Sequence, residues 1–298
     1  MNMSCKHIAV FIASLLFFQI VYGQSKKTVV GEYRMMVPSY MSREEARLTA
    51  IEQAKTEALA KEFGTIVSQT NLMLMEESNR RSKNSFYSIG QCDVKGVWLK
   101  TEGEPIITEQ IVGDEHWIEA KVKGVARELK SATVDIETHL LRNGKGDEFE
   151  SDDYRDGDRF YVSFQSPRNG YLAIYLLDTK RDAYLIVPNK NEELFPVKRG
   201  ERYVFIDDEK ERLILTTEEP MEINQVYVIF SPNKFYSENV SATSDGVDLG
   251  KYRTDEFKNI TRLAYIPCKK FQKWINNLRV KDMEMQVTTK LITIKGQE

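Results

Sequence analysis

Several segments in the first half of the chain alternate between hydrophobic and polar residues, which is the pattern of a strand with one buried face. The clearest case is residues 117–126, where Ile118, Ala120 and Val122 are separated by charged residues. Comparable patterns predict further strands at residues 29–37, 65–75, 86–100 and 106–112. The first half is therefore expected to contain a β-sheet.

One helix is expected to interrupt this series of strands. Ser42 and Glu45 have the spacing of a capping box, which marks a helix N-terminus, and Gly64 is a suitable C-terminal stop. Alanine recurs at every fourth position from Ala46 to Ala58, which gives the helix a stripe of small side chains. Such a stripe lets a helix lie close to a sheet. The predicted order of elements is β-α-β-β-β.

The pattern resets near residues 127–132, and short strands then follow one another closely. They are predicted at residues 133–140, 160–164, 170–177, 183–187, 202–206, 212–216, 225–231 and 283–294. Short strands with Gly, Pro and Asn turns between them are typical of a β-sandwich. A helix is predicted at residues 268–278, where Phe271, Trp274 and Leu278 recur at helical spacing.

Together these patterns predict an α+β protein with two domains behind a leader. Residues 1–23 carry Lys6 and an apolar run that ends near Gly23, which is the arrangement of a secretory signal peptide. Residues 24–130 are expected to form the helix-on-sheet domain, and residues 131–298 the β-sandwich-like domain with its C-terminal helix. The apolar run is shorter than the roughly 20 residues that span a bilayer. We therefore expect an exported protein with no transmembrane segment after signal cleavage.

Composition narrows the expected functions. The formal net charge is −3, from 42 basic and 45 acidic residues, whereas binding to nucleic acid favours a basic domain or stripe. Cys92 and Cys268 remain after removal of the leader and fall in different predicted domains, so we expect them to be unlinked. The sequence has no Cys or His spacing typical of a zinc site, and neither a metal nor a cofactor is expected.

Two stretches could carry catalysis. His116 follows Asp114 and Glu115, and a histidine beside a carboxylate can act as a general base. We favour the alternative interpretation, a solvated turn before a strand.

A second stretch could supply oxygen ligands for calcium, but it lacks the glycine and the distal glutamate of an EF-hand, and we interpret it as a solvated connection. Its acidic residues are Asp152, Asp153, Asp156 and Asp158.

The candidate interaction surface combines aromatic residues of the predicted sandwich with basic residues of its C-terminal helix. Exposed aromatic rings can form a platform for a glycan or a peptide, although aromatic residues also fill half-buried strands. The lysines, together with Arg279, give the helix a basic side that either meets an acidic partner or is its solvated face. The residues of this surface are Tyr171, Tyr175, Tyr184, Lys269, Lys270 and Lys273.

Residues 30–127 combine an alanine-rich helix (SREEARLTAIEQAKTEALAKEFG) with Ile66-Val67-Ser68 after it and Ser88-Ile89-Gly90 at the start of a long strand pair. In these features the segment resembles the N-terminal domain of flagellar assembly protein T and related small exported bacterial lipoproteins. It departs from the lipoproteins at the leader, where Cys5 precedes the apolar run instead of following it.

The second half shows Gly157-Asp158 before a strand, Gly170-Tyr171-Leu172 at the start of the next, and Leu185-Ile186-Val187-Pro188-Asn189. With the ending FQKWINNLRVKDMEMQVTTKLITI, it resembles an uncharacterised bacterial domain family of the Bacteroidetes type. Neither resemblance supplies a catalytic residue. Together they imply an envelope protein of a Gram-negative bacterium, in the periplasm or the outer envelope.

We therefore expect an exported, non-enzymatic binding or assembly module, whose partner is another envelope protein or a cell-wall or glycan component. One alternative is a periplasmic hydrolase that uses the aspartate-rich stretch or His116. The other is a purely structural envelope component. An acid, a base and a nucleophile that converge in one cleft would favour the hydrolase, and a deep aromatic-lined pocket would count against the structural role.

Overall fold

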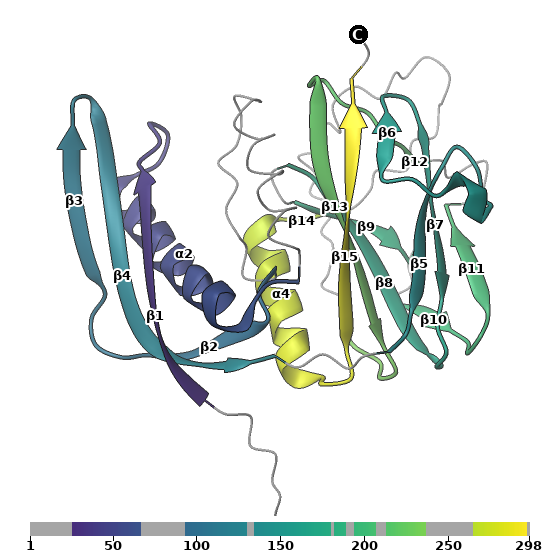
Figure 1. Cartoon of the computed structure of the whole chain (residues 1–298), viewed down its shortest axis with the longest axis horizontal. Helices are drawn as coiled ribbons and strands as arrows, with labels where there is room; N and C mark the ends of the chain where they lie inside the picture. Colours follow the sequence, from purple (N-terminus) through teal and green to yellow (C-terminus); the bar gives the residue numbers. More distant parts are fainter. Residues whose placement is uncertain are drawn as a thin grey trace, which may run out of the picture.

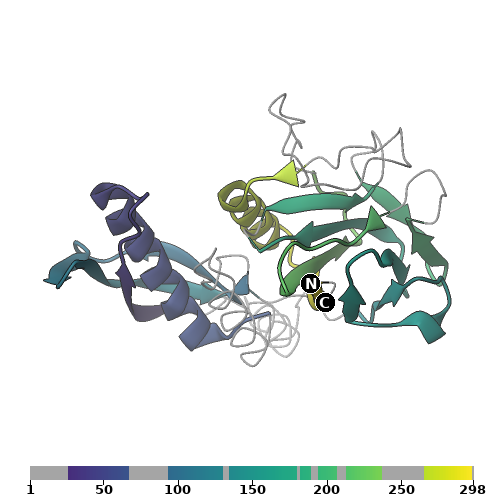
Figure 2. The same cartoon turned by 90° about the horizontal axis from the view of Figure 1, so that it is seen from above.

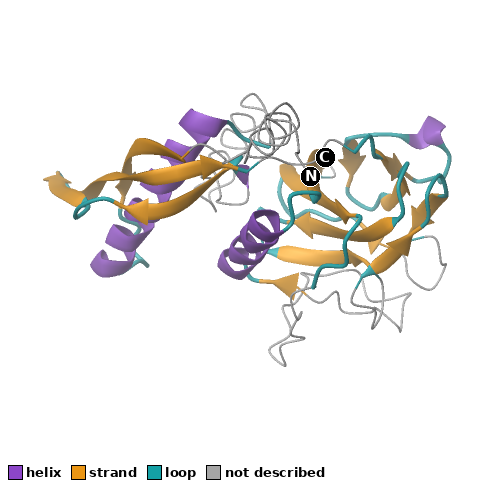
Figure 3. Cartoon of the chain, turned by 90° about the horizontal axis from the view of Figure 1, so that it is seen from below, coloured by secondary structure: helices purple, strands orange, loops and turns teal. Residues whose placement is uncertain are grey.

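The computed structural model describes residues 26–66, 93–129, 134–179, 182–188, 194–206, 213–236 and 265–296. These residues form three β-sheets and two α-helices, with strands as the dominant element (Figures 1 and 3). The predicted α+β class is confirmed. The expected signal peptide, Cys92, nearly all of the strand expected at 65–75 and the first part of that expected at 86–100 lie outside the described residues.

The first sheet is organised around its longest strand, β4. Its strands, and the helix that follows the first of them, are β1 (Lys26–Met36), α2 (Arg43–Phe63), β2 (Gly96–Thr101), β3 (Ile106–Val112) and β4 (Glu115–Glu128). β4 pairs in antiparallel fashion with β1 along one edge and with β2 and β3 along the other. The described elements come in the order β-α-β-β-β, and because the strand expected at residues 65–75 lies almost wholly outside them, they do not test the whole predicted order.

Helix α2 lies across one face of this sheet, as its alanine stripe predicts (Figure 2). Ala46, Ala50 and Ala54 are completely buried. They pack in one hydrophobic cluster with Ile118 and Ala120 of β4. The approach is so close that a Cβ atom at Gly31 would collide with the carbonyl oxygen of Ala54. Glycine in β1 is therefore a requirement of the helix–sheet contact.

Both predicted ends of α2 are confirmed. The backbone N–H of Glu45 donates a hydrogen bond to Ser42 Oγ at 3.2 Å, which satisfies one of the free donors of the first turn. At the other end Gly64 adopts a φ of 82°, a left-handed conformation that glycine enters at little cost.

The second half contains the other two sheets. Its elements are β5 (Glu137–Arg142), the short 3-10 helix η2 (Asp147–Phe149), β6 (Asp153–Arg155), β7 (Arg159–Gln165), β8 (Gly170–Leu177), β9 (Ala183–Val187), β10 (Phe195–Val197), β11 (Arg202–Phe205), β12 (Leu213–Ile214), β13 (Met221–Ser231), β14 (Tyr265–Ile266), α4 (Cys268–Lys281) and β15 (Gln286–Lys295). One sheet has seven strands in the order β14-β9-β8-β13-β15-β6, with β10 beside β8. The other has the order β11-β7-β12, with β5 beside β7.

The seven-stranded sheet is covered on both faces. One set of alternate residues on β13 points into a hydrophobic core that is shared with the sheet of β5, β7, β11 and β12. These residues are Val226, Val228 and Phe230. The alternate residues Tyr227 and Ile229 point to the other face, where α4 packs against them. Figure 1 shows the same layering, with α4 on one side of β13 and β8 and the strands β5, β7 and β11 on the other.

Buried polar contacts join the two halves of the chain. Arg279 of α4 donates a hydrogen bond from Nη1 to the carbonyl oxygen of Val94 at 2.7 Å. The hydroxyl of Tyr227 donates to the carboxylate of Asp93, which is completely buried. Arg279 is therefore not on the exposed basic side of the last helix, as the sequence suggested, because its guanidinium group is used at this junction.

The aspartate-rich stretch at residues 152–158 differs from its predicted structure. Instead of a solvated connection throughout, it contains β6, which pairs in parallel with β15 and places Tyr154 in the core. β6 is only three residues long and is flanked by polar residues, so its pattern is too short to be recognised. Among the described residues, no helix combines the length and apolar character needed to cross a membrane.

Candidate functional site

The tyrosines of the predicted interaction surface do not form one exposed face. Tyr175 is completely buried, with ring centroids 5.2 Å from Phe271 and 5.4 Å from Trp274, so it belongs to the core beneath α4. Tyr184 is also buried, and its ring lies beside that of Tyr265. Tyr171 is half-buried at the start of β8. Tyr175 is therefore inaccessible to a partner, contrary to our expectation.

The three lysines of that surface are exposed. Lys269, Lys270 and Lys273 lie on the solvent side of α4, opposite the buried Phe271 and Trp274. Without Arg279, this basic strip covers only the first half of the helix. Cys268 at the start of α4 is partly exposed, and its Sγ accepts a hydrogen bond from Nε2 of Gln272 at 3.1 Å. Its pairing with Cys92 stays untested, because Cys92 lies outside them.

His116 lies near the start of β4 in a charged cluster that the sequence did not reveal. Its Nε2 atom is 3.0 Å from Oε2 of Glu109, which comes from β3. Two arginines of α2 reach the same carboxylate: Arg43 Nε donates to Oε2 at 2.7 Å, and Arg47 Nε donates to Oε1 at 2.6 Å. The cluster therefore ties β3, β4 and α2 together at one end of the sheet.

The Glu109 carboxylate is held in its charged form by these donors. Partial burial alone would raise the pKa of Glu109, but the hydrogen bonds from Arg43, Arg47 and His116 outweigh it and lower that pKa to about 2. His116 directs Nε2 at a carboxylate that two arginines already neutralise, so the cluster has the character of a structural clamp. The i, i+4 spacing of Arg43 and Arg47 was the visible signal for it.

Beyond this clamp, exposed apolar side chains gather at the end of the sheet, a region that we call the distal tip (Met36, Tyr40, Ile111 and Val112). Ile111 and Val112 are 78% and 56% exposed at the end of β3, beside the hairpin glycine Gly113, whose φ is 62°. As neighbours in a strand, they point to opposite faces of the sheet. Tyr40 is 84% exposed and Met36 is exposed at the end of β1. In Figure 1 the β3–β4 hairpin and the β1–α2 connection end on the same side of the molecule.

The outer face of the first sheet is charged away from the distal tip. Glu32 of β1 forms an ion pair with Lys121 of β4, and the guanidinium of Arg34 lies 4.9 Å from the ring centroid of Trp117. These contacts are typical of a solvated sheet face. Val30 and Ile106 are also exposed on this sheet, but the two most exposed large apolar side chains among the described residues, Tyr40 and Ile111, both lie at the distal tip.

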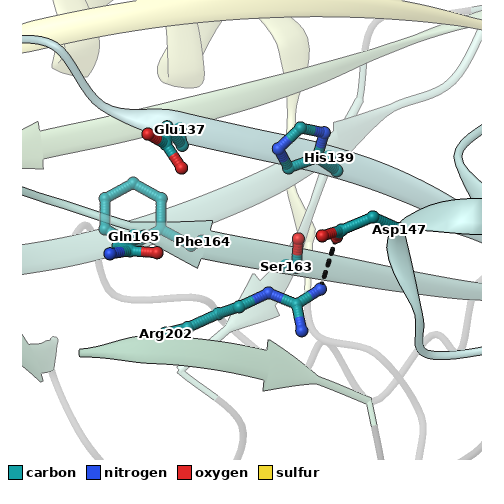
Figure 4. Close-up of a pocket in the computed structure, with 7 residues that line it drawn as sticks. All are labelled: Glu137, His139, Asp147, Ser163, Phe164, Gln165 and Arg202. Atoms are coloured by element: carbon teal, nitrogen blue, oxygen red, sulfur yellow. Dashed lines mark hydrogen bonds and ion pairs between the residues drawn. The ribbon is translucent and has the colours of Figure 1, made fainter. Parts of the chain in front are cut away.

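A small pocket opens on the sheet formed by β5, β7, β11 and β12 (Figure 4). It lies on the outer face of this sheet, away from the core that the sheet shares with the seven-stranded sheet. It has a volume of about 60 Å³. β5, β7 and β11 provide most of its walls, and η2 contributes one acidic side chain at its rim. The lining residues are Glu137, His139, Asp147, Ser163, Phe164, Gln165 and Arg202.

Ion pairs and the register of the strands fix the geometry of this pocket. His139 and Ser163 are direct partners across the β5–β7 pair. Nδ1 of His139 lies 2.8 Å from Oε2 of Glu150, and this hydrogen bond lowers the pKa of Glu150 against the opposing effect of burial. Nη2 of Arg202 donates to Oδ1 of Asp147 at 2.6 Å (Figure 4). The pocket is therefore polar and preformed.

A second groove of about 250 Å³ lies where α2 and β2 approach α4. Trp98, Leu59 and Val97 supply its apolar walls, and Lys55 and Asn276 are among its polar ones. It therefore runs along the junction at which Arg279 and Val94 are joined.

The aspartate-rich stretch sends its carboxylates to separate partners. Asp153 pairs with Lys295 at 2.7 Å, on the strand next to β6. Oδ2 of Asp158 accepts a hydrogen bond from the backbone N–H of Arg155 at 2.7 Å, and Oδ1 of Asp156 accepts one from that of Thr217 at 3.2 Å. In the part of the chain that the structure describes, no group of three or more His, Cys, Asp or Glu side chains is placed to hold a metal ion.

Comparison with known families matches part of the second half. Residues 153–234, from β6 to just beyond β13, match a domain of unknown function (DUF4384). A comparison with curated proteins finds no match. The matched segment includes Ser163 and Arg202 of the small pocket but not the distal tip, and it gives no support to the resemblance noted for residues 30–127. The chain thus contains, in its second half, a segment similar to a domain of unknown function.

Proposed function

We propose that this protein is an exported, non-catalytic binding or assembly module of the cell envelope, which docks another envelope protein through the distal tip. The observation that carries the proposal is the exposure of Ile111, Val112, Met36 and Tyr40 at one end of the sheet, which include the two most exposed large apolar side chains of the described residues. Single exposed apolar residues are ordinary on soluble proteins, but four at the end of one hairpin and the neighbouring connection favour a protein-interaction site.

The clamp beneath the distal tip favours this use. Glu109 joins α2 to β3 and contacts His116 of β4, so both strands of the hairpin and the start of the helix are held in one arrangement. A surface that is ordered before binding loses less conformational freedom when the partner docks. The tip is therefore suited to rigid docking.

The cellular location is part of the proposal and rests on sequence. The charged start and apolar run of residues 1–23 are typical of a secretory signal peptide, which supports export to the periplasm or outer envelope. The resemblance of residues 30–127 to the flagellar assembly protein T domain also points to an assembly role. A cell-wall or glycan component is the alternative partner, and the distal tip, with one tyrosine and three aliphatic side chains, suits a protein better.

A hydrolase that uses His116 or the aspartate-rich stretch is less well supported. His116 Nε2 faces the Glu109 carboxylate, and the aspartates are spread over separate turns and strands. A general base must reach a proton of the substrate in a shared cleft. The purely structural alternative is separated from the binding role by the experiment below.

A pair of charge substitutions at the distal tip tests the proposal. Ile111→Lys combined with Val112→Lys replaces the two apolar side chains that β3 contributes to the distal tip without touching a buried residue. Ile106→Lys is the matched control, because Ile106 is 63% exposed at the other end of the same strand. We expect tagged wild-type protein and the control to capture the same envelope proteins from extract, whereas the double variant loses a specific one. Identical capture by all three proteins would refute docking at the distal tip.

A further inference from the structure

The small pocket on the sheet of β5, β7, β11 and β12 is lined by a hydroxyl group that forms no hydrogen bond with a described residue. Ser163 is only 1% exposed, yet it lines the pocket, and among the described residues its Oγ atom has no hydrogen-bond partner. Figure 4 shows this hydroxyl directed at the opening between His139 and Arg202. The Ser163 side chain is enclosed except toward the pocket, so only water or a ligand in the pocket can hydrogen-bond to its hydroxyl.

The histidine beside it presents a hydrogen-bond acceptor. The ionised carboxylate of Glu150 can only accept a hydrogen bond, so Nδ1 of His139 carries the proton in their contact. In the neutral ring the remaining nitrogen, Nε2, is then an acceptor. The partner of His139 across the strands is Ser163, so the two polar groups lie side by side on the sheet surface.

Carboxylates complete a set of acceptors around the same space. Glu137 lies two residues before His139 on the same face of β5, and its carboxylate forms no ion pair with any described residue. Asp147 stands at the rim, where it already neutralises Arg202. The surplus of charge that faces the pocket is therefore negative, which favours a cationic hydrogen-bond donor.

We propose that this pocket binds the protonated primary amine at the end of a linear aliphatic arm, as in the lysine-type side chain of a peptide. An ammonium group has three donors, which match the Glu137 carboxylate, the Ser163 hydroxyl and His139 Nε2. A volume of about 60 Å³ has room for roughly four water-sized groups, enough for the ammonium and a few methylenes. The amine of a sugar is attached directly to a bulky ring, which does not fit.

This site is separate from the docking proposed for the distal tip, so either can fail alone. It is tested by titrating the mature protein with Nα-acetyl-lysine methylamide while the backbone amide signals are followed by NMR. We expect shifts that saturate at the amides of residues 137–139 and 163–165. The Nε-acetylated form of the same probe, which has lost its charge and two donors, and glucosamine, which carries a ring amine, should produce no such shifts.

Two substitutions and a control assign the binding to the named atoms. Glu137→Gln and Ser163→Ala should each weaken binding, with a loss of about tenfold or more for Glu137→Gln, because its hydrogen bond involves charged groups. Glu104→Gln, an equal change of charge in the exposed turn between β2 and β3, should leave the affinity unchanged. Glu137 is exposed, so its variant should fold normally even if Ser163→Ala does not.

Three results would overturn the proposal. They are an absence of shifts at residues 137–139 and 163–165, equal binding of the Nε-acetylated probe or glucosamine, and equal affinity of the Glu137→Gln and Glu104→Gln variants. The first would show that the pocket takes no amine, and the second that neither charge nor the linear arm is recognised. The third would show that the attraction is a general effect of net charge.

Discussion

Replacing Trp274 by alanine should remove a large part of the stability of the second half. The indole is 2% exposed, packs against Tyr175 and Phe271, and donates a hydrogen bond from Nε1 to the carbonyl oxygen of Tyr236 at 3.1 Å. An aromatic side chain buries roughly 150–250 Å². At about 25 cal/mol per Å² this burial is worth about 4–6 kcal/mol, and the hydrogen bond adds about 1 kcal/mol.

Alanine retains the Cβ atom and its surroundings can partly collapse, so the expected loss is about 3–5 kcal/mol. It can be measured as the change in the free energy of unfolding by urea denaturation of the mature protein. Lys273→Ala, one position earlier on the solvent side of α4, should stay within about 0.5 kcal/mol of wild type. A loss below about 1 kcal/mol for Trp274→Ala would mean that α4 is not packed on the sheet as described.

Three further predictions follow from the junction, the clamp and the cysteines. Arg279→Met should lower the free energy of unfolding by about 1–3 kcal/mol in urea denaturation, because the buried carbonyl of Val94 loses its hydrogen-bond donor. An unchanged free energy of unfolding would mean that this contact is dispensable. The pKa of Glu109 is lowered from 4.5 to about 2, so its charged form contributes stability that is complete above pH 4.5 and is lost as the pH falls through 2. The stability difference between wild type and Glu109→Gln should therefore shrink between pH 5 and pH 2.5, and a constant difference would contradict the clamp. Thiol titration of the denatured, unreduced protein should find Cys92 and Cys268 free, whereas the absence of free thiols in the monomer would reveal a disulfide.

Much of the fold follows from short-range patterns. The alternation along β4 identifies its buried face correctly, because only one face of that strand is covered, by α2. The alanine stripe predicts both the position of α2 and its close approach to β1. The expected strands at 170–177 and 183–187 coincide with β8 and β9.

The error at Tyr175 has a physical cause. β8 is buried on both faces, since Leu172 and Ile174 face the core between the sheets while Ala173 and Tyr175 face α4. A strand covered on both sides has no alternation that separates accessible from inaccessible residues. The sequence therefore predicted the strand but could not show which of its tyrosines were exposed.

The candidate sites depend on contacts that no local pattern contains. Arg43 and Glu109 are 66 positions apart, and their ion pair exists only because α2 folds back over β3. The pocket similarly needs the register of β5 and β7, which places His139 opposite Ser163. Residue types alone led us to His116 as a candidate base, whereas the fold gives it a partner that the sequence did not suggest.

Site-specific photo-crosslinking in the cells that produce the protein tests docking at the distal tip most directly. A photoreactive benzoylphenylalanine placed at Ile111 should form one dominant adduct with another envelope protein after irradiation. The same residue placed at Ile106, which is similarly exposed on the same strand, should form none. The absence of an adduct from position 111, or an equal adduct from both positions, would contradict the account.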